Sequence, residues 1–305
     1  MKTKTVLARI ALLLLVIIII LPYGRSREWR TLNAQSREKL NRNFIELPQG
    51  ITHYEIAGPD NGPVLLLVHG FSVPAYIWDR NFQALADSGF RVIRYDAFGR
   101  GFSDRPEATY NAKFYNCQIN DLLNALKITR PVNIAGVSMG GAVATNFAAN
   151  FPEKVNKVVL IDPVNQVSDI SVLKHRWLGE YLNRVWFVPG LLDDQASDFY
   201  KRSAMPADYQ KNFMEQMNYK GFSTAVLSTI RNFIAVDPRP AFVKLGSSGK
   251  PVLLMWGKQD KTLKYDPGLP SILNADLMMV DSCGHLPQLE QPAIVNSSVT
   301  AFLKK

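Results

Sequence analysis

Short apolar runs recur along most of this 305-residue chain and alternate with longer segments of helical periodicity. Several runs are apolar at every position rather than at every second one, which is typical of strands covered on both faces in a parallel sheet. The alternation of strand and helix predicts an α/β fold with a mostly parallel, doubly wound sheet. The predicted strands are 51–57, 64–68, 91–95, 132–137, 158–161, 252–256 and 277–280, and the predicted helices are 78–88, 114–127, 141–150 and 292–305.

The interval between Pro163 and Pro251 interrupts this alternation. It holds helical pieces rich in aromatic residues and methionine, without a clear central strand, so we interpret it as an insertion. Such residues most often form ordinary core. The underside of an inserted lid, however, faces the carboxyl ends of the strands, where ligands bind in this fold class, so we expect an apolar pocket roof here. The predicted division is a core of residues 44–163 and 250–305 with a helical cap at 164–249.

An unbroken apolar run from Ile10 to Leu21 lies near the start of the chain, with basic residues on both sides. Its length is that of a signal-peptide core, but no A-x-A pattern follows it. If Arg9 snorkels, residues 5–23 are long enough for a tilted membrane span. We expect residues 1–24 to be an uncleaved membrane anchor, with a cleaved export signal or a buried helix as alternatives. The basic flanks leave the orientation open.

The net charge of +9 is concentrated in the N-terminal segment. Residues 1–42 carry nine basic and two acidic residues, a net of +7, which leaves +2 for the rest of the chain. A nearly balanced body argues against a nucleic-acid-binding face. The basic residues extend into the predicted polar linker, 25–43, where each charge favours an anionic lipid surface by about 1 kcal/mol. The two cysteines, Cys117 and Cys283, form neither a disulfide framework nor a zinc pattern, and no metal or cofactor is predicted.

A sharp turn between a predicted strand and a predicted helix carries a serine. The run Gly136-Val137-Ser138-Met139-Gly140-Gly141 joins an apolar strand to a helical segment. In a G-x-S-x-G elbow the serine backbone is strained, and the small residues two before and two after it let strand and helix approach closely. The hydroxyl of Ser138 is then held at the edge of the sheet. The pentapeptide alone would also suit an ordinary tight turn.

A serine hydroxyl becomes a good nucleophile only when a base takes its proton and a third group orients that base. His53 lies in a predicted strand and His175 in the insertion, so we interpret both as structural or surface groups. His69 ends a strand and is expected to shape the loop that follows. His285 follows Gly284 on the loop that leaves the last strand, and it is the predicted base.

Asp260, at the carboxyl end of the strand 252–256, is the predicted orienting acid because it completes the order nucleophile, acid, base. Asp162, at the end of the preceding strand, is the rival, and it could equally cap a turn before its proline. The oxyanion formed on attack needs two backbone N–H donors. We expect one from Met139, directly after the nucleophile, and one from Phe71, in the loop after an early strand.

Five motifs, in this order along the chain, resemble the α/β-hydrolase superfamily, in its branch with a helical cap. The resemblance covers about residues 51–305 and implies the α/β-hydrolase fold with Ser138, Asp260 and His285 as the catalytic triad. It implies structural roles for the loop 96–104 and for Glu290, which looks like a loop brace. The motifs are His69-Gly70-Phe71, Asp96 to Asp104, Gly136 to Gly141, Gly257 to Asp260 and Gly284 to Pro292.

The resemblance also limits which reactions of the superfamily this chain is expected to catalyse. Serine at 138, rather than aspartate, argues against dehalogenase and epoxide-hydrolase chemistry, which in this superfamily needs a carboxylate. Carbon–carbon bond hydrolases commonly have asparagine before the serine and a glycine-rich oxyanion loop, whereas this chain has Val137 and Phe71-Ser72-Val73-Pro74. Proline iminopeptidases differ at Ala97-Phe98-Gly99. We therefore expect a serine hydrolase that cleaves carboxylic esters through an acyl-serine intermediate.

Three alternatives stay open: a carbon–carbon bond hydrolase, a cofactor-free haloperoxidase or perhydrolase on the same triad, and a non-catalytic binding protein on this fold. The apolar N-terminal segment and the cap favour lipid-like esters of medium or long chain, an arrangement similar to that of membrane-anchored monoacylglycerol lipases. The expected partners are a small-molecule ester and a membrane surface, without nucleic acid. The expected location is at a membrane through the single N-terminal segment, with export after signal cleavage as the alternative.

Overall fold

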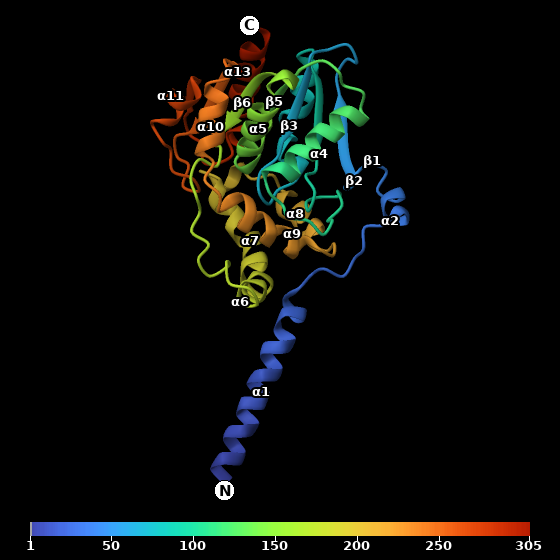
Figure 1. Ribbon diagram of the computed structural model, residues 1–305, viewed down its shortest axis with the longest axis vertical. Coiled ribbons are helices and arrows are strands. Elements are labelled where there is room, and N and C mark those ends of the chain that lie inside the picture. Colours follow the sequence, from blue (N-terminus) through green and yellow to red (C-terminus); the bar gives the residue numbers. More distant parts are fainter. Residues whose placement is uncertain (1) are drawn as a thin grey trace.

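An eight-stranded sheet runs through the folded body of the computed structural model (Figure 1). The structure describes the backbone of residues 2–305 and the side chains of residues 4–305; Met1, the first residue of the predicted 1–24 segment, lies outside the described residues. The strand order is β1-β2-β4-β3-β5-β6-β7-β8, with β1–β2 and β2–β4 antiparallel and the other pairs parallel. The strands are β1 (Asn43–Leu47), β2 (Gly50–Ala57), β3 (Val64–Val68), β4 (Arg91–Tyr95), β5 (Val132–Val137), β6 (Val155–Ile161), β7 (Val252–Gly257) and β8 (Asp276–Val280).

Both faces of the central strands are buried, which explains their continuous apolar sequences. Successive side chains on a strand point to opposite faces. In β3, Leu66 and Val68 join one hydrophobic cluster, and Leu65 and Leu67 join the other. Helices α4 (Ala112–Ala125), α5 (Met139–Asn150), α10 (Arg239–Gly246) and α11 (Leu269–Leu273) cover the first face, and α3 (Phe82–Asp87), α12 (Pro287–Glu290) and α13 (Pro292–Lys304) cover the second. The predicted doubly wound sheet is confirmed.

Some element boundaries differ from the sequence-based expectations. Strand β1 was not predicted; it forms a hairpin with β2, in which Leu47 pairs with Gly50. The predicted helix 78–88 is two pieces, the 3₁₀ turn η1 (Ala75–Trp78) and α3. The expected linker 25–43 contains a short helix, α2 (Ala34–Glu38), whose N-terminus is capped by Asn33.

Between β6 and β7 the chain forms a set of helices over the carboxyl ends of the parallel strands (Figure 1). We call residues 164–249 the cap segment. Within it, α10 packs against α5 and α11 beside the sheet rather than over the strand ends. The other helical pieces are α6 (Leu178–Leu182), η3 (Asn183–Phe187), α7 (Val188–Asp194), η4 (Gln195–Asp198), η5 (Arg202–Ala204), α8 (Tyr209–Met217), α9 (Phe222–Thr229) and η6 (Ile230–Ile234).

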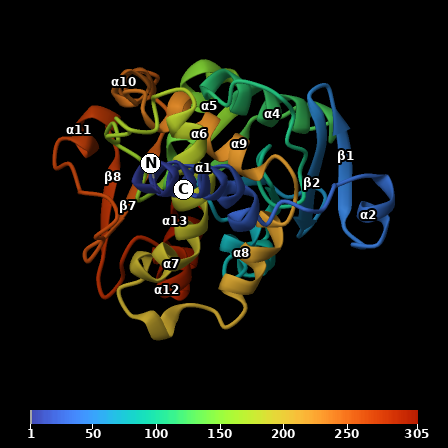
Figure 2. The same ribbon diagram turned by 90° about the horizontal axis from the view of Figure 1, so that it is seen from below.

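Helix α1 (Lys2–Arg25) projects from the body on the side of the cap segment (Figures 1 and 2). Its stretch Lys4–Arg25 is long and apolar enough to cross a membrane, a property that signal sequences share, and none of it is buried in the body. The last residue of α1 and the stretch that follows it are bonded to the cap segment. Arg25 Nε donates a hydrogen bond to the Val185 carbonyl at 3.1 Å, and the Glu28 carboxylate accepts the Gly221 and Ser223 N–H groups.

Candidate active site

Ser138 lies on a strained turn between β5 and α5. Its φ of 56° and ψ of −123° are unusual for a residue with a side chain, and its hydroxyl does not cap the helix. The neighbouring glycines explain how the turn fits. A Cβ atom on Gly136 would lie 2.2 Å from the Gly140 carbonyl oxygen, and one on Gly140 would lie 2.4 Å from the Val68 and His69 carbonyl oxygens. The elbow expected from the sequence is therefore present.

His285 and Asp260 form a hydrogen-bonded pair. The distance from His285 Nδ1 to Asp260 Oδ2 is 2.8 Å, and Asp260 Oδ1 accepts the N–H groups of Thr262 and Leu263. Burial acts to raise the pKa of Asp260, but the hydrogen bond and charge of His285 outweigh it and lower that pKa. Burial acts to lower the pKa of His285, but the bond to Asp260 and the charge of Asp198 raise it. The pair thus favours an ionised Asp260 beside His285.

Asp162, the rival acid, occupies a different position. It is fully buried with a φ of 40°, and its Oδ1 accepts the Gly257 N–H at 3.0 Å. Burial and the nearby charge of Asp260 hold the pKa of Asp162 well above its usual value. The structure therefore pairs His285 with Asp260 and leaves Asp162 beside that pair in surroundings that favour its neutral form.

One atom each of Asp162, Asp260 and His285 lie within 4.8 Å of one another, a spacing at which a metal ion could be held. Their existing contacts favour another interpretation. Asp260 and His285 are joined directly, and Asp162 accepts a backbone N–H. A metal ion would have to replace the hydrogen bond that fixes the imidazole, so these residues fit an acid–histidine pair better than a metal site.

The two backbone groups expected to bind an oxyanion lie next to Ser138. Met139 is the first residue of α5, where N–H groups have no acceptor within the helix, and its side chain packs in the core. Phe71 N–H belongs to the same trans peptide as the Gly70 carbonyl, so the two point in opposite directions. His69 Nδ1 donates to that carbonyl at 2.8 Å, and this turns the Phe71 N–H away from His69.

His69 is a loop-shaping residue, as expected from the sequence. Its Nε2 accepts the Ala97 N–H at 2.8 Å, so the ring is neutral with its proton on Nδ1. Burial lowers the pKa of His69 to about 4, which keeps the ring neutral. The next peptide is fixed by Arg100, whose buried Nε donates to the Phe71 carbonyl at 2.6 Å. Sequence analysis did not identify Arg100, because its partner is a backbone atom of a distant loop.

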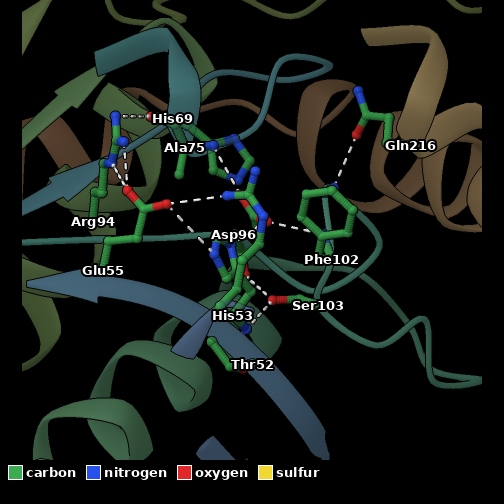
Figure 3. A network of polar contacts seen from close by, with 12 residues as sticks. Thr52, His53, Glu55, His69, Ala75, Arg94, Asp96, Phe102, Ser103 and Gln216 are labelled. Carbon is green, nitrogen blue, oxygen red and sulfur yellow. Dashed lines mark hydrogen bonds and ion pairs between the residues drawn. The ribbon is translucent and has the colours of Figure 1, made fainter. Parts of the chain in front are cut away.

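The loop 96–104 is organised by the buried carboxylate of Asp96 (Figure 3). Asp96 accepts hydrogen bonds from His53 Nδ1 at 2.8 Å and from the N–H groups of Ala75 and Phe102. Burial acts to raise the pKa of Asp96, but the charge and hydrogen bond of His53 lower it overall. His53 is thus a structural residue of β2. His175, the fourth histidine, is exposed in the cap segment.

A cavity of about 520 Å³ lies between the core and the cap segment, with Ser138 and His285 in its wall. The expected apolar roof is only partly correct: Leu191 and Phe199 are joined by Asp194 and Asp198. These acids enter the cavity wall because the end of α7 and η4 lie beside residues 281–286, the loop that carries His285 and that we call the histidine loop. The lining residues are Gly70, Phe71, Ser72, Val73, Ile77, Ser138, Leu191, Asp194, Gln195, Ser197, Asp198, Phe199, Tyr209, Lys261, Thr262, His285 and Leu286.

The cap segment holds the histidine loop directly. The Asp198 carbonyl accepts the His285 N–H at 2.8 Å, and Glu290 accepts the N–H groups of Gly284 and Tyr200. Glu290 therefore braces the loop, and it also joins the loop to the cap segment. Asp198 was missed from sequence because no motif surrounds it. Both cysteines are free thiols, and burial raises the pKa of Cys283 to about 12.

A mostly parallel sheet with a serine elbow at its carboxyl edge and a histidine after its last strand defines the architecture of an α/β hydrolase. A family model described as alpha/beta hydrolase fold matches residues 63–292. The chain belongs to this family and is a hydrolase.

Three similar proteins illustrate the relationship. A 2-hydroxy-6-oxononadienedioate/2-hydroxy-6-oxononatrienedioate hydrolase of Burkholderia vietnamiensis is 30% identical over 268 residues, which are 83% of this chain and 91% of the relative. The meta-cleavage product hydrolase structure from Pseudomonas fluorescens IP01 is 25% identical, with a TM-score of 0.67 over 86% of this chain and 97% of that one. A membrane phospholipase A, described as a bacterial virulence factor, is 22% identical, with a TM-score of 0.68 over 100% of this chain and 98% of that one; this likeness shows the fold alone.

Proposed function

We propose that this hydrolase cleaves carboxylic esters through an acyl-serine intermediate. The observation that carries the proposal is the hydrogen-bonded pair of His285 and Asp260 beside the cavity whose wall contains Ser138. Serine at the elbow supports acyl transfer rather than the carboxylate chemistry of dehalogenases. The loop sequence from Phe71 to Pro74, without the glycines common in carbon–carbon bond hydrolases, supports an ester substrate.

In the proposed mechanism, Ser138 Oγ attacks the ester carbonyl carbon while His285 Nε2 takes the hydroxyl proton. Asp260 keeps the other imidazole proton on Nδ1 and stabilises the imidazolium. The N–H groups of Phe71 and Met139 stabilise the negative charge that develops on the carbonyl oxygen. His285 then gives its proton to the departing alcohol. A water molecule, deprotonated by the same imidazole, hydrolyses the acyl-serine and restores the free hydroxyl.

We further propose that α1 is a membrane anchor and that the substrate is a lipid-like ester of medium or long chain. The stretch Lys4–Arg25 has 22 residues and is mostly apolar; as a helix it is about 33 Å long, which suits a hydrocarbon core of about 30 Å. The division into an anchor at 1–24, a linker at 25–43, a core at 44–163 and 250–305, and a cap at 164–249 belongs to the same proposal. Because α10 packs beside the sheet, we expect lid-like behaviour only from the cap residues before it.

The relatives favour a second candidate, a carbon–carbon bond hydrolase. One is by name a 2-hydroxy-6-oxononadienedioate hydrolase, and another is a meta-cleavage product hydrolase. The same triad could serve that reaction. Adding a 2-hydroxy-6-oxo-dienedioate and following its absorbance separates the candidates: turnover faster than that of every ester tested would replace the ester proposal.

A fluorophosphonate probe tests whether Ser138 is an activated nucleophile. We expect the probe to label the native protein, and neither Ser138→Ala nor His285→Ala to be labelled at a comparable rate. The matched control is Ser72→Ala, which removes another hydroxyl from the cavity wall and keeps the triad. Labelling that survives both triad substitutions, or no labelling of folded native protein, would point to a non-catalytic binding protein.

A series of p-nitrophenyl esters with acyl chains from acetate to palmitate, together with a monoacylglycerol, tests the substrate class. We expect kcat/KM to rise with chain length to a medium or long chain. A maximum at acetate would refute the lipid preference while leaving the ester reaction intact.

A further inference from the structure

Trp177 and Trp186 are the most exposed large apolar side chains of the cap segment, with 76% and 72% of their surface accessible. Trp78 and Trp256 are buried in the core, and Trp29 is exposed in the stretch that follows α1. Tryptophan is enriched at the boundary between membrane and water, because its ring is apolar and its N–H is polar. Exposed tryptophans next to a predicted membrane helix therefore indicate a surface that contacts the membrane–water boundary.

Both tryptophans lie where α1 leaves the body. Trp177 precedes α6 and Trp186 lies in η3, next to Val185, whose carbonyl is bonded by Arg25 at the end of α1. Figure 1 shows α6 at the edge of the body from which α1 projects, and Figure 2, from below, shows α1 nearly end on in front of α6 and α7. A bilayer crossed by α1 would thus lie against this part of the cap segment.

The charges around the two tryptophans have one predominant sign. Lys174, Arg176 and Arg184 are exposed, and the Arg176 guanidinium lies 5.1 Å from the Trp177 ring centroid. The only acidic residue from 172 to 187 is Glu180, which is paired with Arg231 at 2.6 Å. Exposed aromatic and basic side chains together favour the headgroup region of an anionic membrane.

We propose that this surface, the tryptophan face, rests in the headgroup region of the anionic bilayer that α1 crosses. The tryptophan face consists of Lys174, Arg176, Trp177, Leu178, Arg184 and Trp186. The proposal rests on the anchoring role proposed above for α1. It adds a second contact, which fixes how the catalytic body is oriented on the membrane rather than only tethering it.

This orientation brings the catalytic cavity close to the lipid. The helical run from Leu178 to Asp194 is continuous through η3, and Leu191 near its end lines the cavity. Trp186 and Leu191 are five residues apart, which is about 8 Å along a helix. Leu191 and Ser138 line the same cavity, so one helical run extends from the tryptophan face to the cavity wall. The proposal therefore takes the membrane itself as the source of the ester substrate.

Fluorescence quenching by brominated lipids tests the contact without relying on activity. The full-length protein is reconstituted in vesicles of phosphatidylcholine and phosphatidylglycerol, with or without lipids brominated near the glycerol end of the acyl chain. We expect Trp177→Phe/Trp186→Phe to lose at least about half of the quenching seen in the native protein, because tryptophan in the interface lies within reach of the bromine. Trp29→Phe is the matched control and should retain more of the quenching than the double variant.

A pair of rate measurements tests whether the tryptophan face orients the catalytic body for a substrate in the membrane. Trp177→Ala/Trp186→Ala should lower the hydrolysis of a long-chain monoacylglycerol in vesicles by about fivefold or more, because the body loses its orientation on the lipid. The same variant should hydrolyse a water-soluble short-chain ester at the native rate. Val243→Ala/Leu277→Ala, which truncates exposed apolar side chains on α10 and β8, should leave both rates unchanged.

Several results would overturn the proposal. The first is equal quenching of the native and the double-Phe protein in vesicles, and the second is an equal loss of both activities in the double-Ala variant. The third is conversion of a detergent-solubilised dimer to a monomer by the double-Ala substitution, because the tryptophan face would then be a contact between two copies of the chain. Failure of the native protein to float with vesicles would refute the anchor as well. Absence of all ester hydrolysis, with quenching as expected, would refute only the proposed ester reaction.

Discussion

Asp260 and Asp162 lie beside one histidine, yet their surroundings favour opposite protonation states. Asp260 accepts hydrogen bonds from His285 and from two backbone N–H groups, all of which stabilise its charge. Asp162 is fully buried and has the charge of Asp260 nearby, both of which favour its neutral form. The two side chains are chemically identical, so the difference between their pKa values, and with it their different roles, follows from their surroundings.

We predict different costs for replacing the two acids. Asp260→Asn should lower kcat/KM for an ester by about 10³-fold to 10⁴-fold, because an amide in that place favours the wrong imidazole tautomer. Asp162→Asn should cost less than about tenfold, since the amide oxygen can still accept the Gly257 N–H. Steady-state kinetics of the two variants provide the comparison, and circular dichroism checks their folding. A larger loss at Asp162 would reverse the assignment of the acid.

The pH profile is predicted from the pKa of His285. A general base acts only when neutral, and the pKa of His285 is raised, so the acid limb of kcat/KM should have its midpoint above 6.5. The charge of Asp198 contributes to that rise, so Asp198→Asn should move the limb to lower pH. Asp194→Asn, which changes another acid of the cavity wall, is the control and should move it less. A shift to higher pH in Asp198→Asn would contradict the electrostatic explanation.

At the scale of elements, the elbow depends on how closely β3 and β5 approach α5. We predict that Gly140→Ala destabilises the protein by about 1–3 kcal/mol, because the added methyl meets two backbone carbonyl oxygens that cannot rotate away. Thermal or urea unfolding measures the change. Gly190→Ala in α7, where a Cβ meets nothing within 4 Å, is the control. Equal stability of both variants would show that the elbow can relax.

The sequence predicted those elements whose burial leaves a clear pattern. The central strands are apolar on both faces, so they could be identified without knowledge of their neighbours. Strand β1 was not predicted because its residues are mostly exposed or half-exposed and follow a basic segment. The alternation Ile45-Glu46-Leu47, before the turn Pro48-Gln49, was the available signal. Helix α11 has only five residues, too few for a helical period to be recognised.

The site residues that lie in sequence motifs could be predicted. The residues that the fold brings to the site from distant parts of the chain could not. Ser138, Asp260 and His285 each follow a strand, and the short loops keep them near the sheet edge. Arg100 and Asp198 act on backbone atoms of other loops, and a backbone atom leaves no sequence signature. The sequence also overestimated how apolar the cavity roof is, since Asp194 at the end of α7 and Asp198 in η4 are part of the cavity wall.

At the scale of the whole molecule, the anchoring role proposed for α1 has a direct test. We predict that the mature protein keeps α1 and stays with the membrane fraction through a high-salt or carbonate wash, because apolar burial rather than charge holds it there. Mass spectrometry of the N-terminal peptide provides the direct measurement. A mature N-terminus beyond Tyr23 would establish cleavage and remove the anchor. Removal by salt alone would indicate surface adsorption through the basic residues.

The attachment of the histidine loop to the cap segment restricts how a substrate enters. Asp198 and Tyr200 are bonded, directly or through Glu290, to the residues that hold His285. If this stretch moved outward, it would pull the catalytic base away from Ser138. Any opening that keeps the imidazole in place must therefore leave residues 198–200 where they are. Under that constraint substrate entry and catalytic alignment would be mechanically independent, and the enzyme would not have to rebuild its active site each time the cap closes.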